Sequence, residues 1–208
     1  MGRSSPATRA ARAVESYRSA ADCIGSIEPG SAVFAVTRGQ FSMIDAVLHV
    51  LDEVGRAERL SLWTWTVADY EIETFKRLMM DGRIGRGVLV IDGGARAKNA
   101  ALIRSWQGAF GPDSVRYVLN HAKIATVEGA GLRVLLRGSM NLNHNPRFEQ
   151  LDVSEGGPAF ELVRDIEEGL PVLPDDAAGS EVYRASKVAD AFEPEQLAAF
   201  SKLRRWAK

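Results

Sequence analysis

A histidine and a lysine stand two residues apart near the middle of the chain, at His121 and Lys123. Alternate side chains of a β-strand point to the same face of a sheet, so a strand here would carry both groups to one site. A neutral imidazole is a competent nucleophile near pH 7, because the ordinary pKa of a histidine is about 6.5. A neighbouring ammonium binds phosphoryl oxygens and stabilises developing negative charge. The pair therefore predicts chemistry on a phosphate ester.

A second polar group follows the next predicted strand, in the sequence Gly138-Ser139-Met140-Asn141. A glycine lets the backbone approach a ligand closely, and the Ser139 and Asn141 side chains are small donors that can reach the same oxygens. No cluster of carboxylates suited to Mg²⁺ accompanies these groups. The sequence therefore predicts phosphoryl transfer through a covalent phosphohistidine, with no metal and no cofactor.

Together these residues resemble the signature of the phospholipase D superfamily, H-x-K-x4-D followed by G-S-x-N. Here it reads His121-x-Lys123-x4-Glu128 and then Gly138-Ser139-x-Asn141, and the resemblance covers roughly residues 31–166. Glu128 stands where the family has an aspartate, which is usually a structural support. We count Glu128 among the expected site residues because a carboxylate one methylene longer can still reach the same partner.

The resemblance implies a role for each of the other residues. His121 would be the nucleophile that forms the phosphohistidine, or the acid that protonates the leaving oxygen. Lys123 and Asn141 would hold the phosphate, and Ser139 would help to orient the site. Glu149, which resembles the family's acidic residue after the asparagine loop, would hydrogen-bond a histidine and fix its tautomer.

Several residues near this motif are candidates for contacts with the substrate. Arg137 and Arg147 flank the motif and are candidates for phosphate contacts, with plain solvent exposure as the alternative. His144 lies in a polar loop beside the site, where it would either touch substrate or remain solvated. Trp63 and Trp65 alternate on a strand near the site, which is typical of core packing and also permits stacking on unpaired bases.

The family's site needs two histidine motifs, whereas this chain has three histidines and only one H-x-K. Neither His49 nor His144 begins a second motif. The resemblance therefore implies a symmetric homodimer in which the two motifs meet on the two-fold axis. Small single-motif members of the family are typically endonucleases, so we expect a nuclease that cleaves DNA. The alternative is a catalytically inactive nucleic-acid-binding or assembly module.

Net charge, cysteine content and the lengths of the apolar runs restrict the partners and the compartment that we expect for this protein. The net charge of the 208 residues is −1, so any contact with nucleic acid must come from a local patch. The single cysteine, Cys23, cannot form an internal disulfide and is expected to be a buried thiol, which fits the cytoplasm. No run of about 18 apolar residues is present, so no membrane span or membrane partner is expected.

The elements that must position the motif alternate along the chain. Apolar runs and alternation predict strands over 31–37, 60–66, 88–91, 115–119, 122–127, 132–137 and 151–154. Helical periodicity with stop signals predicts helices over 40–54, 69–82, 97–110 and 158–170. Strand–helix alternation implies parallel pairs, and the short connection after 122–127 implies an antiparallel hairpin. We expect an α/β fold with a mixed β-sheet flanked by helices, a phospholipase D-like sandwich.

The chain is predicted to have three parts. Residues 1–30 form an arginine-rich N-terminal arm, which is either solvated or in contact with a polyanion. Residues 31–173 form the phospholipase D-like domain. Residues 174–208 comprise a linker and a C-terminal helix, with an apolar stripe over 197–206 that would pack on the core or on a partner chain.

Overall fold

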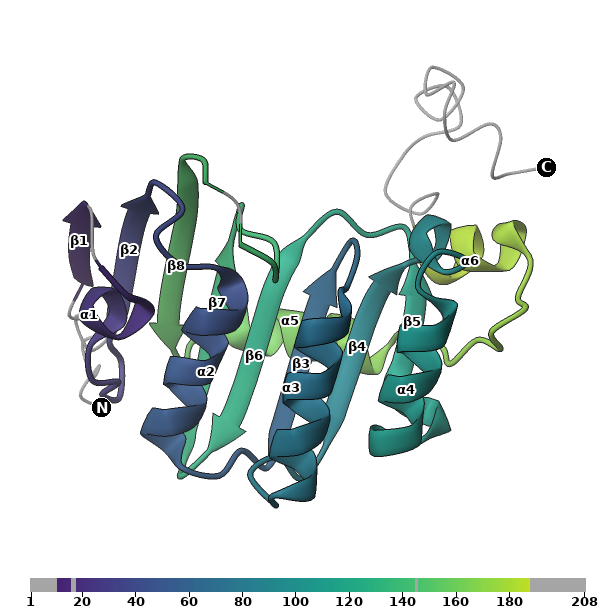
Figure 1. The fold of residues 1–208 in the computed structure, drawn as a ribbon, viewed down its shortest axis with the longest axis horizontal. Coiled ribbons are helices and arrows are strands. Elements are labelled where there is room, and N and C mark those ends of the chain that lie inside the picture. The colour runs from purple at the N-terminus through teal and green to yellow at the C-terminus, as the bar shows by residue number, and fades with distance from the viewer. Residues whose placement is uncertain (1–10, 16–17, 145, 188–208) are drawn as a thin grey trace, which may run out of the picture.

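The structure is a computed structural model that describes residues 11–15, 18–144 and 146–187. Its strands are β1 (Ala11–Glu15), β2 (Ala32–Thr37), β3 (Arg59–Thr64), β4 (Gly87–Asp92), β5 (Val115–Val118), β6 (Lys123–Gly129), β7 (Leu132–Gly138) and β8 (Glu149–Glu155). Within the described residues they form one eight-stranded sheet in the order β1-β2-β8-β7-β6-β3-β4-β5 (Figure 1). The expected α/β class is confirmed.

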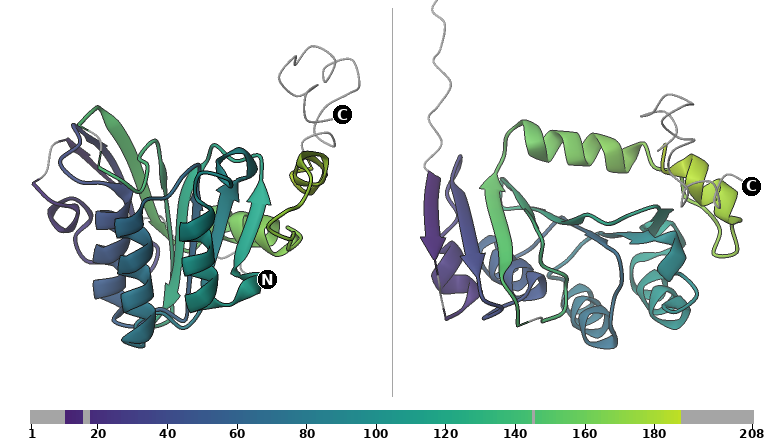
Figure 2. Two further views of the ribbon diagram at one scale, coloured as in Figure 1. Left: turned by 45° about the vertical axis from the view of Figure 1, so that its right-hand side comes forward. Right: turned by 90° about the horizontal axis from the view of Figure 1, so that it is seen from above.

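Helices cover both faces of this sheet. They are α1 (Ala20–Ile24), α2 (Met43–Val54), α3 (Asp69–Met80), α4 (Ala100–Phe110), α5 (Pro158–Glu168) and α6 (Gly179–Ala185). Viewed from above, α2, α3 and α4 lie on one face and α5 runs along the other (Figure 2). The layers of helix, sheet and helix agree with the sandwich expected from the sequence.

Strand pairing is mixed, as the order of elements predicts. β3, β4 and β5 pair in parallel, whereas β6 and β7 form an antiparallel hairpin. Its two turn residues, Ala130 and Gly131, have φ values of 51° and 76°. Positive φ at both positions gives the turn twist that matches the twist of the flanking strands. The resulting register sets Lys123 opposite Gly138, so the two parts of the motif lie on neighbouring strands.

Alternation along β6 sends its side chains to two different faces. Ala125 belongs to the larger core beneath α2, α3 and α4, whereas Ile124 packs beside Phe160 of α5. Lys123 has the same parity as Ala125, and Glu128 has the same parity as Ile124. The lysine and the glutamate of the motif therefore leave the strand on opposite faces and near opposite ends.

The apolar stripe of α2 is buried as predicted. Ile44, Leu51 and Val54 are each no more than 6% exposed. Asp45 accepts hydrogen bonds from the backbone N–H and hydroxyl of Ser42 at the start of the helix, at 2.8 and 2.7 Å. Gly55 ends the helix at a φ of 68°, as its position in the sequence predicts.

Two helix starts differ from prediction. α2 begins at Met43 and not at residue 40, with Ser42 as its N-cap residue. α3 begins at Asp69 as predicted, and the backbone N–H of its N-cap residue Ala68 donates to Glu71. α4 begins at Ala100 and not at Ala97, because a 3₁₀ turn over Gly93–Ala95 follows β4. In the part of the chain that the structure describes, no helix is long and apolar enough to cross a bilayer.

The segment predicted to be an N-terminal arm contains ordered elements. Ala11–Glu15 pairs in parallel with β2 at the edge of the sheet. The Arg12 guanidinium donates to the carbonyls of Cys23 and Ile24 at the end of α1, at 2.6 and 2.8 Å. Cys23 is fully buried as predicted, and burial raises the pKa of its thiol. Arg12 therefore stabilises a helix C-terminus, a use that charge alone does not predict.

The segment predicted to be a linker also packs on the sheet. Asp175 accepts a hydrogen bond of 2.6 Å from the hydroxyl of Tyr117 in β5. α6, which was not predicted, buries Val182, and the Ser186 hydroxyl accepts from the backbone N–H of Leu119 at 2.7 Å. The predicted C-terminal helix, with its stripe over 197–206, lies outside the described residues.

Candidate functional site

The motif lies at one end of the strands, where β3, β4 and β7 end and β6 and β8 begin. We call this row of strand ends the sheet edge. Lys123 is the first residue of β6, and His121 precedes the strand instead of lying within it. The Lys123 Nζ is nevertheless 3.4 Å from both ring nitrogens of His121 and donates to the His121 carbonyl at 2.8 Å. The structure thus brings the two groups together, through a turn and not through strand alternation.

A buried asparagine positions this turn, and its role was not predicted. Asn120 is 7% exposed, and its side-chain amide donates to the Thr64 carbonyl at the end of β3, at 3.0 Å. Its side-chain oxygen accepts from Ala122, and its backbone N–H donates to Asp92 at the end of β4, both at 2.9 Å. Asn120 therefore ties the turn that carries His121 to the ends of β3 and β4. A polar residue directly after a buried strand was the available signal.

The two tryptophans have different environments. Trp63 packs between the sheet and α5, and its indole N–H donates to Glu167 at 3.0 Å. Trp65 lies just beyond β3, is 51% exposed, and has its ring 6.3 Å from the His121 ring, centroid to centroid. Core packing therefore explains Trp63, whereas Trp65 belongs to the surface of the site.

Ser139 and Glu149 form a direct pair across β7 and β8. The Ser139 hydroxyl donates to the Glu149 carboxylate and accepts from the Gln150 backbone N–H at 2.9 Å. Among the described residues, the hydrogen-bond partner of Glu149 is thus this serine and not a histidine. The role of Glu149 in fixing a histidine tautomer stays a prediction.

Gly138 permits this close pairing. A Cβ added at Gly138 would lie 2.0 Å from the backbone oxygen of Gln150, which itself accepts from Ser139 N–H at 3.1 Å. Backbone cannot move aside as a side chain can, so the strands would have to separate. The glycine of the motif is therefore required by the sheet geometry that presents Ser139.

Gly138→Ala is expected to destabilise the fold by about 1–3 kcal/mol, the usual cost of overpacking. It should also displace Ser139 from Glu149, because the two strands have to separate. Urea unfolding measures the loss of stability. The matched control is Gly108→Ala in α4, where a Cβ meets nothing within 4 Å. That substitution should stabilise the protein by about 0.5–1 kcal/mol. Equal effects of the two substitutions would contradict this explanation of Gly138.

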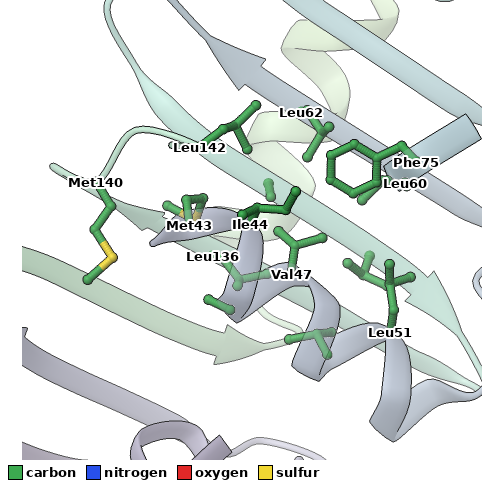
Figure 3. Packing of buried hydrophobic residues seen from close by; sticks show 14 of the residues in the cluster. Met43, Ile44, Val47, Leu51, Leu60, Leu62, Phe75, Leu136, Met140 and Leu142 are labelled. Atoms are coloured by element: carbon green, nitrogen blue, oxygen red, sulfur yellow. The ribbon is translucent and has the colours of Figure 1, made fainter. Parts of the chain in front are cut away.

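The loop that carries Asn141 is anchored by its apolar neighbours. Met140 and Leu142 are 2% and 4% exposed, and their side chains lie beside Met43 and Ile44 of α2 in Figure 3. The Asn141 carbonyl accepts from Met43 N–H at 3.2 Å, which satisfies a free donor at the helix start. The Asn141 side chain is half-buried, and the group that it can offer to a phosphoryl oxygen is its Nδ2 amide, which donates.

The predicted substrate-binding residues are arranged unequally. Arg137 forms an ion pair of 3.3 Å with Asp152 across β7 and β8, which neutralises part of its charge. Arg147 and His144 are exposed in the loop between β7 and β8. The same loop carries Phe148, with the Arg38 guanidinium 5.5 Å from the centre of its ring. Arg147 and His144 are accessible to a ligand, and their roles stay predictions.

Glu128 does not join the others. It lies near the far end of β6, where its carboxylate is 3.1 Å from Arg164 of α5 and 3.9 Å from Arg59 of β3. Burial and the nearby Arg164 and Arg86 cations lower the pKa of Arg59 to about 10, against the opposing effect of Glu128. This placement removes Glu128, which was expected among the site residues, from the group around His121.

The group at the sheet edge thus combines an imidazole, an ammonium, a hydroxyl paired with a carboxylate, and an amide. These are a nucleophile and donors for phosphoryl oxygens. In the regions that the structure describes, no three His, Cys, Asp or Glu side chains are grouped to hold a metal ion.

No protein-family model matches the sequence, and no curated protein sequence matches it. Phosphatidylserine synthase from Haemophilus influenzae is structurally similar, with a TM-score of 0.48 and 11% identity over 80% of this chain and 41% of that one. Polyphosphate kinase from Porphyromonas gingivalis has a TM-score of 0.47 and 16% identity over 66% and 25%. TrmBL2, an archaeal chromatin protein, has a TM-score of 0.43 and 9% identity over 68% and 51%.

This chain spans from a quarter to about half the length of these three structures. The synthase and the kinase are members of the phospholipase D superfamily. At such TM-scores and identities, nothing about activity follows from the likeness. Any assignment of activity has to rest on the residues at the sheet edge.

Proposed function

We propose that this protein is a phosphodiesterase of the phospholipase D type that cleaves DNA without a metal ion, through a phosphohistidine at a dimer-shared site. The observation that carries the proposal is the contact between His121 and Lys123, 3.4 Å from the ammonium to either ring nitrogen. Ser139, one strand away, adds a hydroxyl held by Glu149. The full His–Lys–Ser–Asn set of the motif thus gathers at one sheet edge.

The reaction has two steps. A neutral His121 nitrogen attacks phosphorus, the P–N bond forms, and the P–O bond to the leaving sugar oxygen breaks. A second, protonated imidazole gives its proton to that oxygen, while Lys123 and Asn141 bind the non-bridging oxygens. Water then attacks the phosphohistidine and loses a proton to the second imidazole. The P–N bond breaks and His121 is restored.

The second imidazole comes from another copy of the chain. His49 is bound by its Nε2 to the carbonyl of Gly25 at 2.8 Å, on α2. His144 lies in an exposed loop and has no lysine two residues later. His121 of the partner subunit, brought in by a two-fold axis, supplies an equivalent group with its own lysine.

The activity is tested by incubating the purified protein with single-stranded and duplex DNA in excess EDTA. We expect cleavage of the DNA under these conditions, since every group in the proposed reaction belongs to the protein. Cleavage that requires an added divalent ion would contradict the proposed chemistry. A folded protein that binds DNA and cleaves none of it would indicate the alternative, an inactive binding or assembly module.

The shared site requires a dimer. Static light scattering at micromolar concentration should therefore give twice the mass of the 22.7 kDa chain. Activity per chain should also fall on dilution once dimers dissociate, because each half-site alone lacks its acid. A strictly monomeric protein that still cleaves DNA would contradict the shared site.

A further inference from the structure

Two aromatic rings are exposed at the sheet edge that carries His121. Trp65 is 51% exposed and Phe148 is 73% exposed. Both residues lie outside the strands, directly after β3 and directly before β8. Single exposed rings are ordinary on protein surfaces, but these two both stand at the strand ends that carry His121 and Ser139.

The two rings lie on either side of the catalytic group. In the sheet order, β6 and β7 separate β3 from β8, and they carry Lys123 and Ser139. Three strand spacings put the attachment points of the rings about 14 Å apart. Trp65 reaches toward the centre, since its ring is 6.3 Å from that of His121. An extended ligand lying across these strand ends would contact the Trp65 ring, then the His121–Lys123 pair, and then the Phe148 ring.

Cations accompany both rings. The Arg38 guanidinium is 5.5 Å from the centre of the Phe148 ring, and Arg147 is the preceding residue. On the other side, the Lys123 ammonium touches the His121 ring that neighbours Trp65. Aromatic faces interleaved with cations are the arrangement that binds single-stranded nucleic acid, with bases stacked on rings and phosphates near the cations.

We infer that the substrate of this site is a single strand of nucleic acid, with unpaired bases stacked on Trp65 and Phe148 and the scissile phosphate between them at His121. This inference rests on the proposed phosphodiesterase function for the position of the phosphate. In a duplex both faces of each base are stacked on neighbours, and exposing a base costs energy. The two rings therefore select against duplex, while stacking tolerates any base sequence.

The test compares three labelled DNA probes of equal length: a single strand, its duplex, and a single strand that lacks bases. Fluorescence anisotropy in EDTA measures Kd in the His121→Ala background, in which the probes stay intact. It compares this protein with the same protein carrying Trp65→Ala, Phe148→Ala or the control Phe34→Ala. Phe34 is a 43% exposed ring in the middle of β2, away from the sheet edge.

Each of the two edge substitutions should weaken binding of the normal single strand by about tenfold. The strand without bases should bind equally to the His121→Ala protein and to these variants, and Phe34→Ala should change nothing. Trp65→Phe, which keeps a ring, should retain most of the affinity. Equal affinity for strands with and without bases, or tighter binding of duplex, would overturn the inference.

A cleavage assay in EDTA with His121 intact, on the same three probes, separates this inference from the proposed function. If the protein cleaves DNA in EDTA but binds strands with and without bases equally, the proposed function stands and the single-strand inference is wrong. If the protein binds single strands through Trp65 and Phe148 but cleaves none of them, the binding surface stands and the proposed phosphodiesterase function is wrong. Binding to none of the three probes overturns the inference.

Discussion

Replacing His121 with alanine is expected to reduce DNA cleavage in EDTA by about ten-thousandfold or more. In the shared site each His121 serves as a nucleophile or as an acid, so the substitution removes both groups at once. Folding should be unaffected, because the side chain is exposed and packs only against Trp65 and Lys123 among the described residues. Gel-based cleavage assays and circular dichroism measure the two quantities.

The matched control is His49→Gln. His49 lies on α2, and its contact is the Gly25 carbonyl, not the sheet edge. This variant should cleave DNA at the unaltered rate. If His121→Ala retained activity, the nuclease would be another site or a contaminant, and the assignment of the motif would be wrong.

Replacing Glu167 with alanine is expected to destabilise the fold by about 3–5 kcal/mol, without touching the sheet edge. Glu167 is 2% exposed and accepts hydrogen bonds from Arg59, Ser61 and Trp63 of β3. Its loss would leave the Arg59 charge buried, with only the more distant Glu128 and Glu168 carboxylates to offset it. Thermal unfolding should shift downward by on the order of 10 °C for a chain of this length.

Glu168→Ala is the control for that effect. Glu168 is also an anion of α5, with a contact of 2.8 Å to Arg164, but its side chain is 59% exposed. Water screens such a pair, so its loss should cost less than about 1 kcal/mol. Equal destabilisation by the two substitutions would show that burial of Glu167 is not what makes its ion pairs important.

Most of the sheet could be predicted from local patterns. The continuous apolar run of β4 indicates a strand buried on both faces, and the strand lies where expected. The apolar stripe of α2 indicates a helix buried on one face, and it also lies where expected. β1, α1 and α6 could not be found in this way. They are short, and contacts such as those of Arg12 with α1 or Ser186 with Leu119 join residues that no local period connects.

The site was predictable in part. The spacing correctly predicts that His121 and Lys123 lie together. The two side chains meet because Asn120 fixes the turn before β6, and not because both residues lie in one strand. The bond between Ser139 and Glu149 depends on the pairing of β7 with β8, which sequence distance does not reveal. Glu128 was grouped with the site by motif position, whereas strand parity directs it toward α5. Periodicity was the better guide for that residue.

The most direct test of the proposal is to trap the covalent intermediate. A labelled DNA substrate is mixed with the protein in EDTA, quenched in alkaline denaturant within the first turnover, and digested for mass spectrometry. The proposal predicts a nucleotide attached through a P–N bond to the peptide that contains His121. Rapid cleavage with no adduct on His121, or with an adduct on another residue, would contradict it.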